Sequence, residues 1–390
     1  MTGLATVVGL APAAAAGTSP SPAATSPATA TGTLLRPDTG LYPRVIRLSH
    51  SGRENGTLVA SIVTFDGANG LGAIYASHDG GRSFAQIGTV ADPAAADGKG
   101  LCCASIYELP QRVGAMPAGT LLWTASEGQS SGANRRMSIQ IWKSTDHGHT
   151  WSFLSTAAVA PNALGVWEPE LTVSGRGRLA VFFSDETDQP AHSQMLDEAT
   201  SANGLNWSTR VPVVASTDPQ ARPGMANVRR IPRLGYLMTY EVCGSTYDCG
   251  IHYRISPDGV RWGDPSDLGP QITAANGEYF HHTPTIAWTP GHGPDGQLFL
   301  VGQILHDPDG SVAAANGSAV MVSHHGPAGP WTVIPAPVSV PSPDNNYCPN
   351  YSSTLLPMKG GTRLLEIATA YAPDQECKAY FATSGTSHRP

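Results

Sequence analysis

The 390-residue sequence has few charged residues, no long apolar segment and no concentration of positive charge. Asp, Glu, Lys and Arg make up 14% of the chain, and the formal net charge is −7. Because no basic stripe is present, we do not expect nucleic acid to be a partner. No run of about 18 apolar residues occurs, so we do not expect a membrane-spanning helix.

The N-terminus also lacks positive charge, because the first basic residue is Arg36. A secretory signal normally begins with a positive segment, followed by an apolar core and a cleavage site of small residues. Residues 4–11 supply the apolar core, and Ala14-Ala15-Ala16 supplies the small residues. We therefore expect residues 1–16 to be a signal peptide, either complete or truncated at its start, and the protein to be secreted.

The stretch that follows is low in sequence complexity. Residues 17–32 are nearly all Ala, Ser, Thr and Pro, a composition typical of a disordered linker. We expect residues 33–390 to form the folded domain. The chain contains 43 glycines and 33 prolines, and 41% of its residues are apolar. This mixture favours many short strands joined by turns, and hence an all-β fold, over a helical protein.

Six cysteines suit an exported protein. We predict two disulfides between cysteines that are separated along the chain, Cys243–Cys249 and Cys348–Cys377, although other pairings fit the sequence. Cys102 and Cys103 are adjacent, so they are either free and buried or joined in a vicinal disulfide. None of the cysteine spacings is typical of a zinc site, and we predict neither a metal nor a cofactor.

One turn motif recurs along the chain after short apolar runs. Its five copies, the last of them faint, span residues 77–84, 144–151, 201–207, 256–262 and 323–331. Asp-Gly or Asn-Gly supplies the positive-φ positions of a hairpin, Ser and Asp cap its backbone, and an aromatic residue anchors it. The copies recur at intervals of about 60 residues, which indicates a repeat architecture.

Radial repetition of four-stranded sheets is a β-propeller. The roughly 350 residues after the linker, divided by about 60, predict six blades. The sixth blade would span residues 351–383, closed by an N-terminal strand near Leu34-Leu35. The turns resemble the Asp-boxes of sialidase-like propellers, whose pattern is S-x-D-x-G-x-T-W. The first two copies match this pattern almost completely, so we predict a six-bladed propeller of the sialidase-like type in which the repeats are structural.

Two acidic positions stand out from the turn chemistry. Glu168 and Glu170 flank Pro169 at the start of an apolar, β-branched run, and Glu241 closes the strand-like run 235–240. Two carboxylates on distant strands are what a glycoside hydrolase requires. The alternative is that Glu168 is a buried, hydrogen-bonded acid and Glu241 a solvated strand end.

Several short motifs occur in an order that resembles glycoside hydrolase family 93. They are Y-P-R at residue 42, C-C at 102, W-E-P at 167, S-D-E at 184, R-P-G-M at 222, Y-E at 240, N-Y-S at 350 and L-L-P-M at 355. The set covers nearly the whole chain after Thr33. The resemblance implies an exo-α-1,5-L-arabinanase on a six-bladed propeller, which releases arabinobiose from linear arabinan with retention.

The resemblance also implies residue roles. The catalytic glutamates fall on Glu168 and Glu241. Glu170 is an alternative to Glu168, because residues two apart share a face of an extended strand. The implied mechanism is double displacement, in which one carboxylate attacks and the other transfers protons. The implied substrate-binding residues are Arg44, Trp167, Arg222 and Tyr351, with Tyr347 a less favoured choice for the late tyrosine.

Two other functions fit the same fold. An exo-sialidase would use Arg44 in an arginine triad and Tyr351 as the nucleophile, but Glu241 is followed by residues 242–244, Val-Cys-Gly, and not by a nearby arginine. A non-catalytic carbohydrate-binding propeller would keep the repeats without a working acid pair, since fold alone does not establish function. In each case we expect a monomer whose partner is a polysaccharide or an oligosaccharide.

Overall fold

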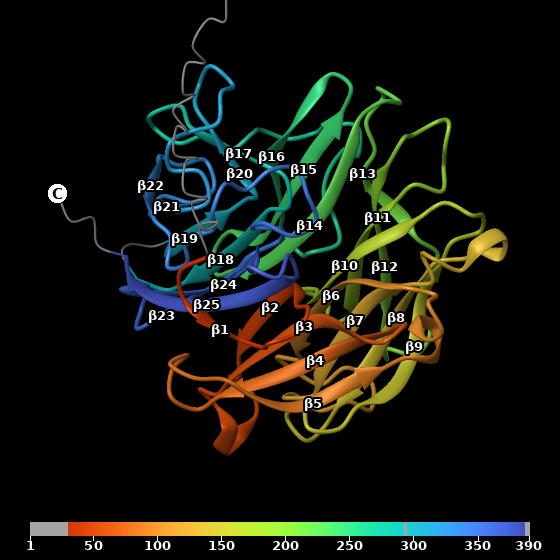
Figure 1. Cartoon of the computed structure of the whole chain (residues 1–390). Coiled ribbons are helices and arrows are strands. Elements are labelled where there is room, and N and C mark those ends of the chain that lie inside the picture. Colours follow the sequence, from red (N-terminus) through yellow and green to blue (C-terminus); the bar gives the residue numbers. More distant parts are fainter. Residues whose placement is uncertain (1–29, 292–294, 387–390) are drawn as a thin grey trace, which may run out of the picture.

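The computed structural model describes residues 30–291 and 295–386, so the predicted signal peptide and most of the linker lie outside the described residues. The described residues form an all-β structure whose strands are arranged in six sheets around a central axis (Figure 1). This confirms the predicted six-bladed propeller. Within the described ranges the helical elements are three 3-10 turns, η1 (Gly52–Glu54), η2 (Pro93–Ala95) and η3 (Gly132–Asn134). None of the described helices is long and apolar enough to cross a membrane.

The first three blades are consecutive four-stranded antiparallel sheets, each running outward from the axis. Blade 1 contains β2 (Leu41–Arg47), β3 (Leu58–Asp66), β4 (Asn69–Ser77) and β5 (Ala85–Ala91). Blade 2 contains β6 (Leu101–Glu108), β7 (Leu121–Glu127), β8 (Ser138–Ser144) and β9 (Ser152–Val159). Blade 3 contains β10 (Val166–Val173), β11 (Leu179–Asp185), β12 (Met195–Ser201) and β13 (Val211–Val214).

Blade 4 takes in a strand from the segment that forms blade 5, because β20 lies between β19 and β21 in sequence but pairs with β17 of blade 4. Blade 4 contains β14 (Arg222–Ile231), β15 (Gly235–Gly244), β16 (Tyr247–Ser256), β17 (Tyr279–His281) and β20 (Ile304–His306). Blade 5 contains β18 (Thr285–Thr289), β19 (Gln297–Val301), β21 (Ala319–Ser323) and β22 (Trp331–Pro335).

Blade 6 is built from both ends of the chain. It contains β23 (Thr354–Met358), β24 (Arg363–Tyr371), β25 (Cys377–Gly385) and β1 (Thr33–Leu34). β1 pairs antiparallel with β25, with Thr33 opposite Phe381 and Leu34 opposite Tyr380. The predicted closure by an N-terminal strand is therefore confirmed. This pairing fastens the ring, because the N-terminal strand that precedes blade 1 is bonded into the last blade through backbone hydrogen bonds.

The hydrophobic core lies between neighbouring blades. Phe182 and Phe183 are adjacent on β11 and therefore point to opposite faces of their sheet. Phe183 packs in the cluster shared with blade 2, whereas Phe182 packs with blade 4 and meets Trp262 edge-on at 5.6 Å between ring centroids. Since both faces of the central strands are covered, these strands are apolar along most of their length rather than alternating.

The repeated turns connect the third and fourth strands of blades 1, 2, 3 and 5. In the second copy, Gly148 N–H donates to Ser144 Oγ at 2.9 Å, and Thr150 N–H donates to Asp146 Oδ1 at 2.9 Å. Gly148 has a φ of 102°, a conformation open to glycine but not to most residues. The turn is therefore stabilised by its own side chains. The copy in blade 4 leads into a long segment before β17 instead of directly into a strand.

The cysteines form three disulfides, which leave no free cysteine among the described residues. Cys243–Cys249 and Cys348–Cys377 are paired as predicted. Of the two alternatives for the adjacent cysteines, the vicinal disulfide Cys102–Cys103 is the one found.

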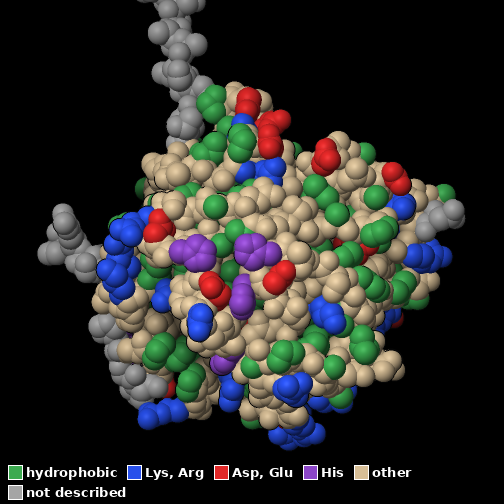
Figure 2. All heavy atoms as spheres, turned by 90° about the horizontal axis from the view of Figure 1, so that it is seen from below, with side chains coloured by type: hydrophobic (Ala, Val, Ile, Leu, Met, Phe, Trp, Pro, Cys, Tyr) green, Lys and Arg blue, Asp and Glu red, His purple; other side chains and the backbone are tan. Residues whose placement is uncertain are grey.

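The surface of the propeller is mixed in character. On the face drawn in Figure 2, acidic and basic side chains are interspersed among polar and apolar ones.

Candidate active site

The innermost strand of every blade reaches the axis through a local backbone kink. Each kink contains a residue other than glycine with positive φ: Tyr42 (48°), Cys103 (64°), Glu168 (53°), Met225 (58°), Thr283 (52°) and Ser352 (55°). In β2, β6, β10 and β14 the kink coincides with a β-bulge. L-residues rarely adopt this conformation, and bulges often redirect side chains near active sites. We call these six residues the axial ring.

The sequence analysis did not find the axial ring, although a weak signal exists. Each ring residue is followed by Pro, Ala or Ser and then by a polar residue or an arginine. The triplets are Tyr-Pro-Arg, Cys-Ala-Ser, Glu-Pro-Glu, Met-Ala-Asn, Thr-Pro-Thr and Ser-Ser-Thr. Alignment of the six blades on these triplets, instead of on the turns alone, would have placed Glu168 at the axis.

Glu168 is the one member of the axial ring that carries a carboxyl group. Ser184 Oγ donates to Glu168 Oε2 at 2.6 Å and itself accepts from Met225 N–H at 3.0 Å. Burial raises the pKa of Glu168 to about 7, against the lowering effect of the Ser184 bond and with help from the nearby charges of Glu241 and Glu186. Glu168 can therefore hold a proton at mildly acidic pH, as a general acid must.

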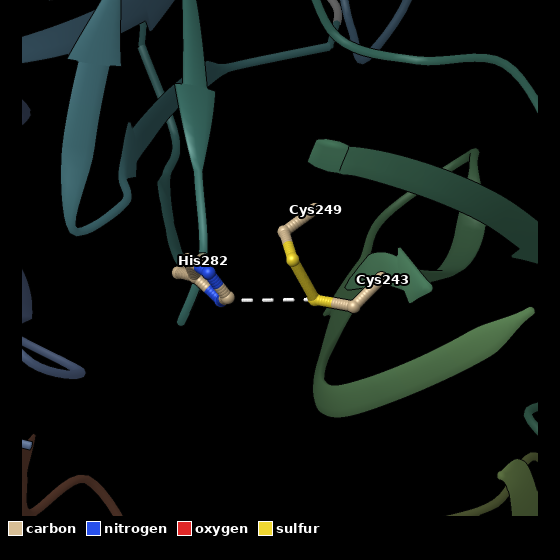
Figure 3. Close-up of side chains that lie close together, drawn as sticks. All are labelled: Cys243, Cys249 and His282. Carbon is tan, nitrogen blue, oxygen red and sulfur yellow. Dashed lines mark hydrogen bonds between the residues drawn. A yellow bond between two sulfur atoms is a disulfide. The ribbon is translucent and has the colours of Figure 1, made fainter. Parts of the chain in front are cut away.

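Glu241 is buried near the end of β15 and is held by the segment that leads into blade 5. Its Oε2 accepts from Thr283 N–H at 2.7 Å and lies 3.4 Å from His282 Nδ1. His282 in turn lies against the Cys243–Cys249 disulfide, with Nδ1 3.7 Å from Cys243 Sγ (Figure 3). These two cysteines and His282 lie close enough to surround an ion. Both sulfurs are in the disulfide, however, so the group does not offer the thiolates that a metal requires.

Two tyrosines lie beside the carboxylates. Burial raises the pKa of Tyr351 well above its ordinary value, and the charges of Glu168 and Glu241 add to this shift. Burial also raises the pKa of Tyr42, whose ring centroid is 6.3 Å from that of Tyr351. Both phenols therefore stay protonated and remain hydrogen-bond donors. Tyr42 is a site residue that the sequence analysis missed, although it begins the Y-P-R motif.

Arg44 is buried on β2, the innermost strand of blade 1. Its guanidinium carbon lies 4.2 Å from the centroid of the Tyr42 ring. Arg44 Nη1 donates to the carbonyl oxygens of Pro43 at 2.8 Å and Ser352 at 3.1 Å. Arg44 therefore connects the innermost strands of blades 1 and 6 and supports the ring of Tyr42, which lies next to the carboxylates.

Trp167 and Arg222 are joined through an acid that the sequence analysis assigned no role. Glu186 accepts from Trp167 Nε1 at 2.9 Å and from Arg222 Nη2 at 2.6 Å. Burial acts to raise the pKa of Glu186, but these two hydrogen bonds and the charge of Arg222 outweigh it, so the pKa lies below its ordinary value. Arg222 also donates to Gln194 Oε1 at 2.7 Å. These hydrogen bonds hold Trp167, which precedes Glu168 in the chain, together with Arg222.

Glu170 is placed differently from Glu168. Because β10 has a bulge between Trp167 and Glu170, the alternation that would put both glutamates on one face does not apply, which corrects that expectation. Glu170 accepts from Ser105 Oγ at 3.0 Å and Asn227 Nδ2 at 3.1 Å, and it is ion-paired with Arg229. Its oxygens are occupied by contacts that join blades 2, 3 and 4.

No protein-family model matches the chain, and no curated protein matches it significantly. The chain is similar to the GH93 α-L-arabinofuranosidase of Fusarium graminearum, solved with arabinobiose, with 25% identity and a TM-score of 0.72 over 92% of this chain and 97% of that one. It is similar to the Penicillium chrysogenum α-L-arabinanase, complexed with arabinobiose, with 25% identity and a TM-score of 0.73 over 92% and 98% of the two chains.

A more distant similarity is limited to the fold. A protein of unknown function from Dyadobacter fermentans is 12% identical and superimposes with a TM-score of 0.61 over 91% of this chain and 97% of that one. The similarities at 25% identity extend over nearly the whole described propeller and include every blade.

Proposed function

Since the chain is a glycosidase related to glycoside hydrolase family 93, we propose that it is a secreted exo-acting enzyme that releases arabinobiose from linear α-1,5-L-arabinan with retention. The observation that carries the proposal is the placement of two carboxylates on neighbouring blades near the propeller axis. Ser184 links Glu168 to the backbone of Met225, and Glu241 lies opposite Gly224, the residue before Met225. Two solved structures of similar chains hold arabinobiose. The disulfides support secretion.

The environments of the two carboxyl groups suggest which role each one has. Glu168 carries the raised pKa, so we assign it as the acid/base. Glu241 accepts a backbone N–H from Thr283 and lies 3.4 Å from His282 Nδ1, contacts that hold the carboxylate in place, so we assign it as the nucleophile.

The reaction then proceeds in two displacements. Glu241 attacks the anomeric carbon while Glu168 gives its proton to the departing glycosidic oxygen, which leaves an arabinobiosyl ester on Glu241. In the second displacement Glu168, now a carboxylate, takes a proton from water. The resulting hydroxide attacks the same carbon and frees Glu241. Two inversions at one carbon give net retention.

We assign substrate binding to the walls around these carboxylates. The neutral phenol of Tyr351 supplies a hydrogen-bond donor beside both glutamates. Trp167 and Arg222, held by Glu186, form one wall, and Arg44 supports Tyr42 on the other. The role of Glu170 is structural in this proposal, because its oxygens are already engaged.

The same contacts favour arabinan over a sialoside. A substrate carboxylate requires arginines with free donors, whereas Arg222 is ion-paired with Glu186. A neutral sugar chain needs no such counter-charge.

Product analysis after incubation with linear, debranched α-1,5-arabinan tests the proposal. We expect release of a disaccharide, and its loss in Glu168→Ala and Glu241→Ala, with a fluorogenic sialoside left intact. Cleavage of the sialoside would overturn the proposal and make Tyr351 the candidate nucleophile. Binding of arabinan without cleavage would favour a carbohydrate-binding propeller.

A further inference from the structure

Tyr347 is the most exposed large hydrophobic or aromatic side chain among the described residues, with 63% of its surface open to solvent. Among the Phe, Tyr and Trp side chains of the described residues, only Phe65, Phe153 and Tyr347 are exposed. An exposed tyrosine presents an apolar ring face together with a polar hydroxyl, a combination that suits the faces and hydroxyls of sugars.

The segment that carries Tyr347 is held on both sides. The following residue, Cys348, is buried and bonded to Cys377. The preceding residue, Asn346, accepts from the Tyr371 hydroxyl at 3.0 Å, and its carbonyl oxygen accepts from Gln303. The Tyr347 ring meets that of Tyr371 edge-on, with 6.4 Å between centroids. The exposure of Tyr347 thus belongs to a fixed ring, and a fixed ring loses little entropy on binding.

Tyr347 lies on the segment that leads to the axis. Asn350 Nδ2 donates to the carbonyl oxygens of Gly302 and Gln303 at 3.0 Å, so the segment packs on the end of blade 5 from which Thr283 reaches Glu241. Tyr351 follows four residues after Tyr347, which limits the separation of their Cα atoms to about 14 Å. A sugar chain with its end at Glu168 needs only a few residues to cover such a distance.

Polar residues suited to sugar hydroxyls precede Tyr347 in the chain. Asp344 and Asn345 precede it and are exposed. Carboxylate and amide side chains beside an aromatic ring supply acceptors and donors for the hydroxyls of a sugar that stacks on the ring.

We propose that Tyr347 is a distal sugar-binding platform, on which a residue of the substrate chain outside the catalytic pocket stacks. This inference rests on the proposed function, because it assigns a further subsite to the same substrate. It makes Tyr347 a residue that selects for chain length without touching the reacting atoms.

The kinetics of Tyr347→Ala on substrates of different length test the platform. We expect KM for α-1,5-arabinohexaose and for linear arabinan to rise by about threefold to tenfold, because one aromatic contact is lost. We expect kcat, and both constants for arabinotriose, to stay unchanged. Tyr347→Trp should retain the wild-type values.

Phe153→Ala is the matched control. Phe153 is 51% exposed and meets Trp142 edge-on at 5.8 Å between centroids, so its surroundings resemble those of Tyr347. It lies beside the turn 144–151, at the opposite end of the sheets from the carboxylates. Equal effects of Tyr347→Ala on the triose and the hexaose, or an effect of Phe153→Ala as large as that of Tyr347→Ala, would overturn the platform.

Affinity electrophoresis separates failure of the platform from failure of the proposed function. Wild-type protein, Tyr347→Ala and Phe153→Ala would be run through gels containing linear arabinan or one of several other polysaccharides. Retardation of the wild type that only Tyr347→Ala loses would support the platform even if arabinan were not cleaved. Equal retardation of all three proteins, or none in any gel, would overturn it whatever the outcome of the product analysis.

Discussion

The acids at the two ends of the propeller sheets have opposite surroundings. In the turn 144–151, burial acts to raise the pKa of Asp146, but hydrogen bonds from Thr150 and Ser144 outweigh it and hold the pKa at about 2. At the axis, burial wins instead and raises the pKa of Glu168 to about 7. The bonds of Asp146 come from residues two to four positions away, whereas those of Glu168 come from other strands.

This contrast separates an acid that is satisfied within its own turn from the acid that we propose as catalytic. An acid whose donors are neighbours in sequence is satisfied as soon as its turn forms, and it contributes only to the turn. An acid placed on a kinked strand and surrounded by other blades can have a raised pKa, which is useful for catalysis. A cavity of about 330 Å³ lies along the innermost strands and is lined by Arg47, Glu108 and Trp288 among others, but not by Glu168 or Glu241.

The largest expected effect is on activity. Glu168→Gln and Glu241→Gln should each lower kcat for arabinan by about a thousandfold or more, because each removes a group that takes part in bond formation or proton transfer. Melting temperatures should change little. Asp146→Asn, the counterpart at the other end of the sheets, should leave kcat unchanged. An equal loss of activity in Asp146→Asn would remove the distinction between the two ends.

The pH dependence should follow Glu168. Its folded pKa of about 7 lies above the ordinary value of 4.5, so the protonated acid required for the first displacement is lost as pH rises through 7. We expect kcat/KM to fall about tenfold per pH unit above that point. The stability that this group contributes is fully present below pH 4.5 and is lost as pH rises through 7. A pH–rate profile with its alkaline limb below pH 5 would contradict the assignment.

Glu170 provides a test within a single strand. Glu170→Ala should lower the free energy of unfolding by about 2 to 3 kcal/mol, because it leaves Ser105, Asn227 and Arg229 without their acceptor. Chemical denaturation would measure this loss. The folded fraction should still cleave arabinan with a kcat within about tenfold of the wild type. A stable but inactive variant would instead indicate that Glu170 is the acid that acts.

The smallest effect should come from the repeated turns. Asp146→Ala should destabilise the protein by about 1 kcal/mol, since it removes partners from a half-exposed turn that other contacts also hold. Thermal unfolding would detect it, with activity at 25 °C as the control. A loss as large as that of Glu170→Ala would show that the turn acids contribute as much as the axial contacts.

Much of the architecture could be predicted because its signals are local. A turn such as 144–151 contains its own donors, acceptors and glycine, so its sequence is sufficient to indicate its structure. Repetition of that turn determined the number of blades and the need for a closing strand, which is β1. The separated cysteine pairs were predicted from their positions in the chain and match the disulfides found.

Only the tertiary structure decided which acids meet and in what state. Glu168 and Glu170 are two positions apart, yet a bulge and a positive φ give one a raised pKa and the other a full set of contacts. The contributions of Glu186 and His282 were not evident from sequence, because each acts through partners on other segments of the chain. Burial and charge coupling depend on distances between segments remote in sequence, so they arise only when the ring of blades has closed.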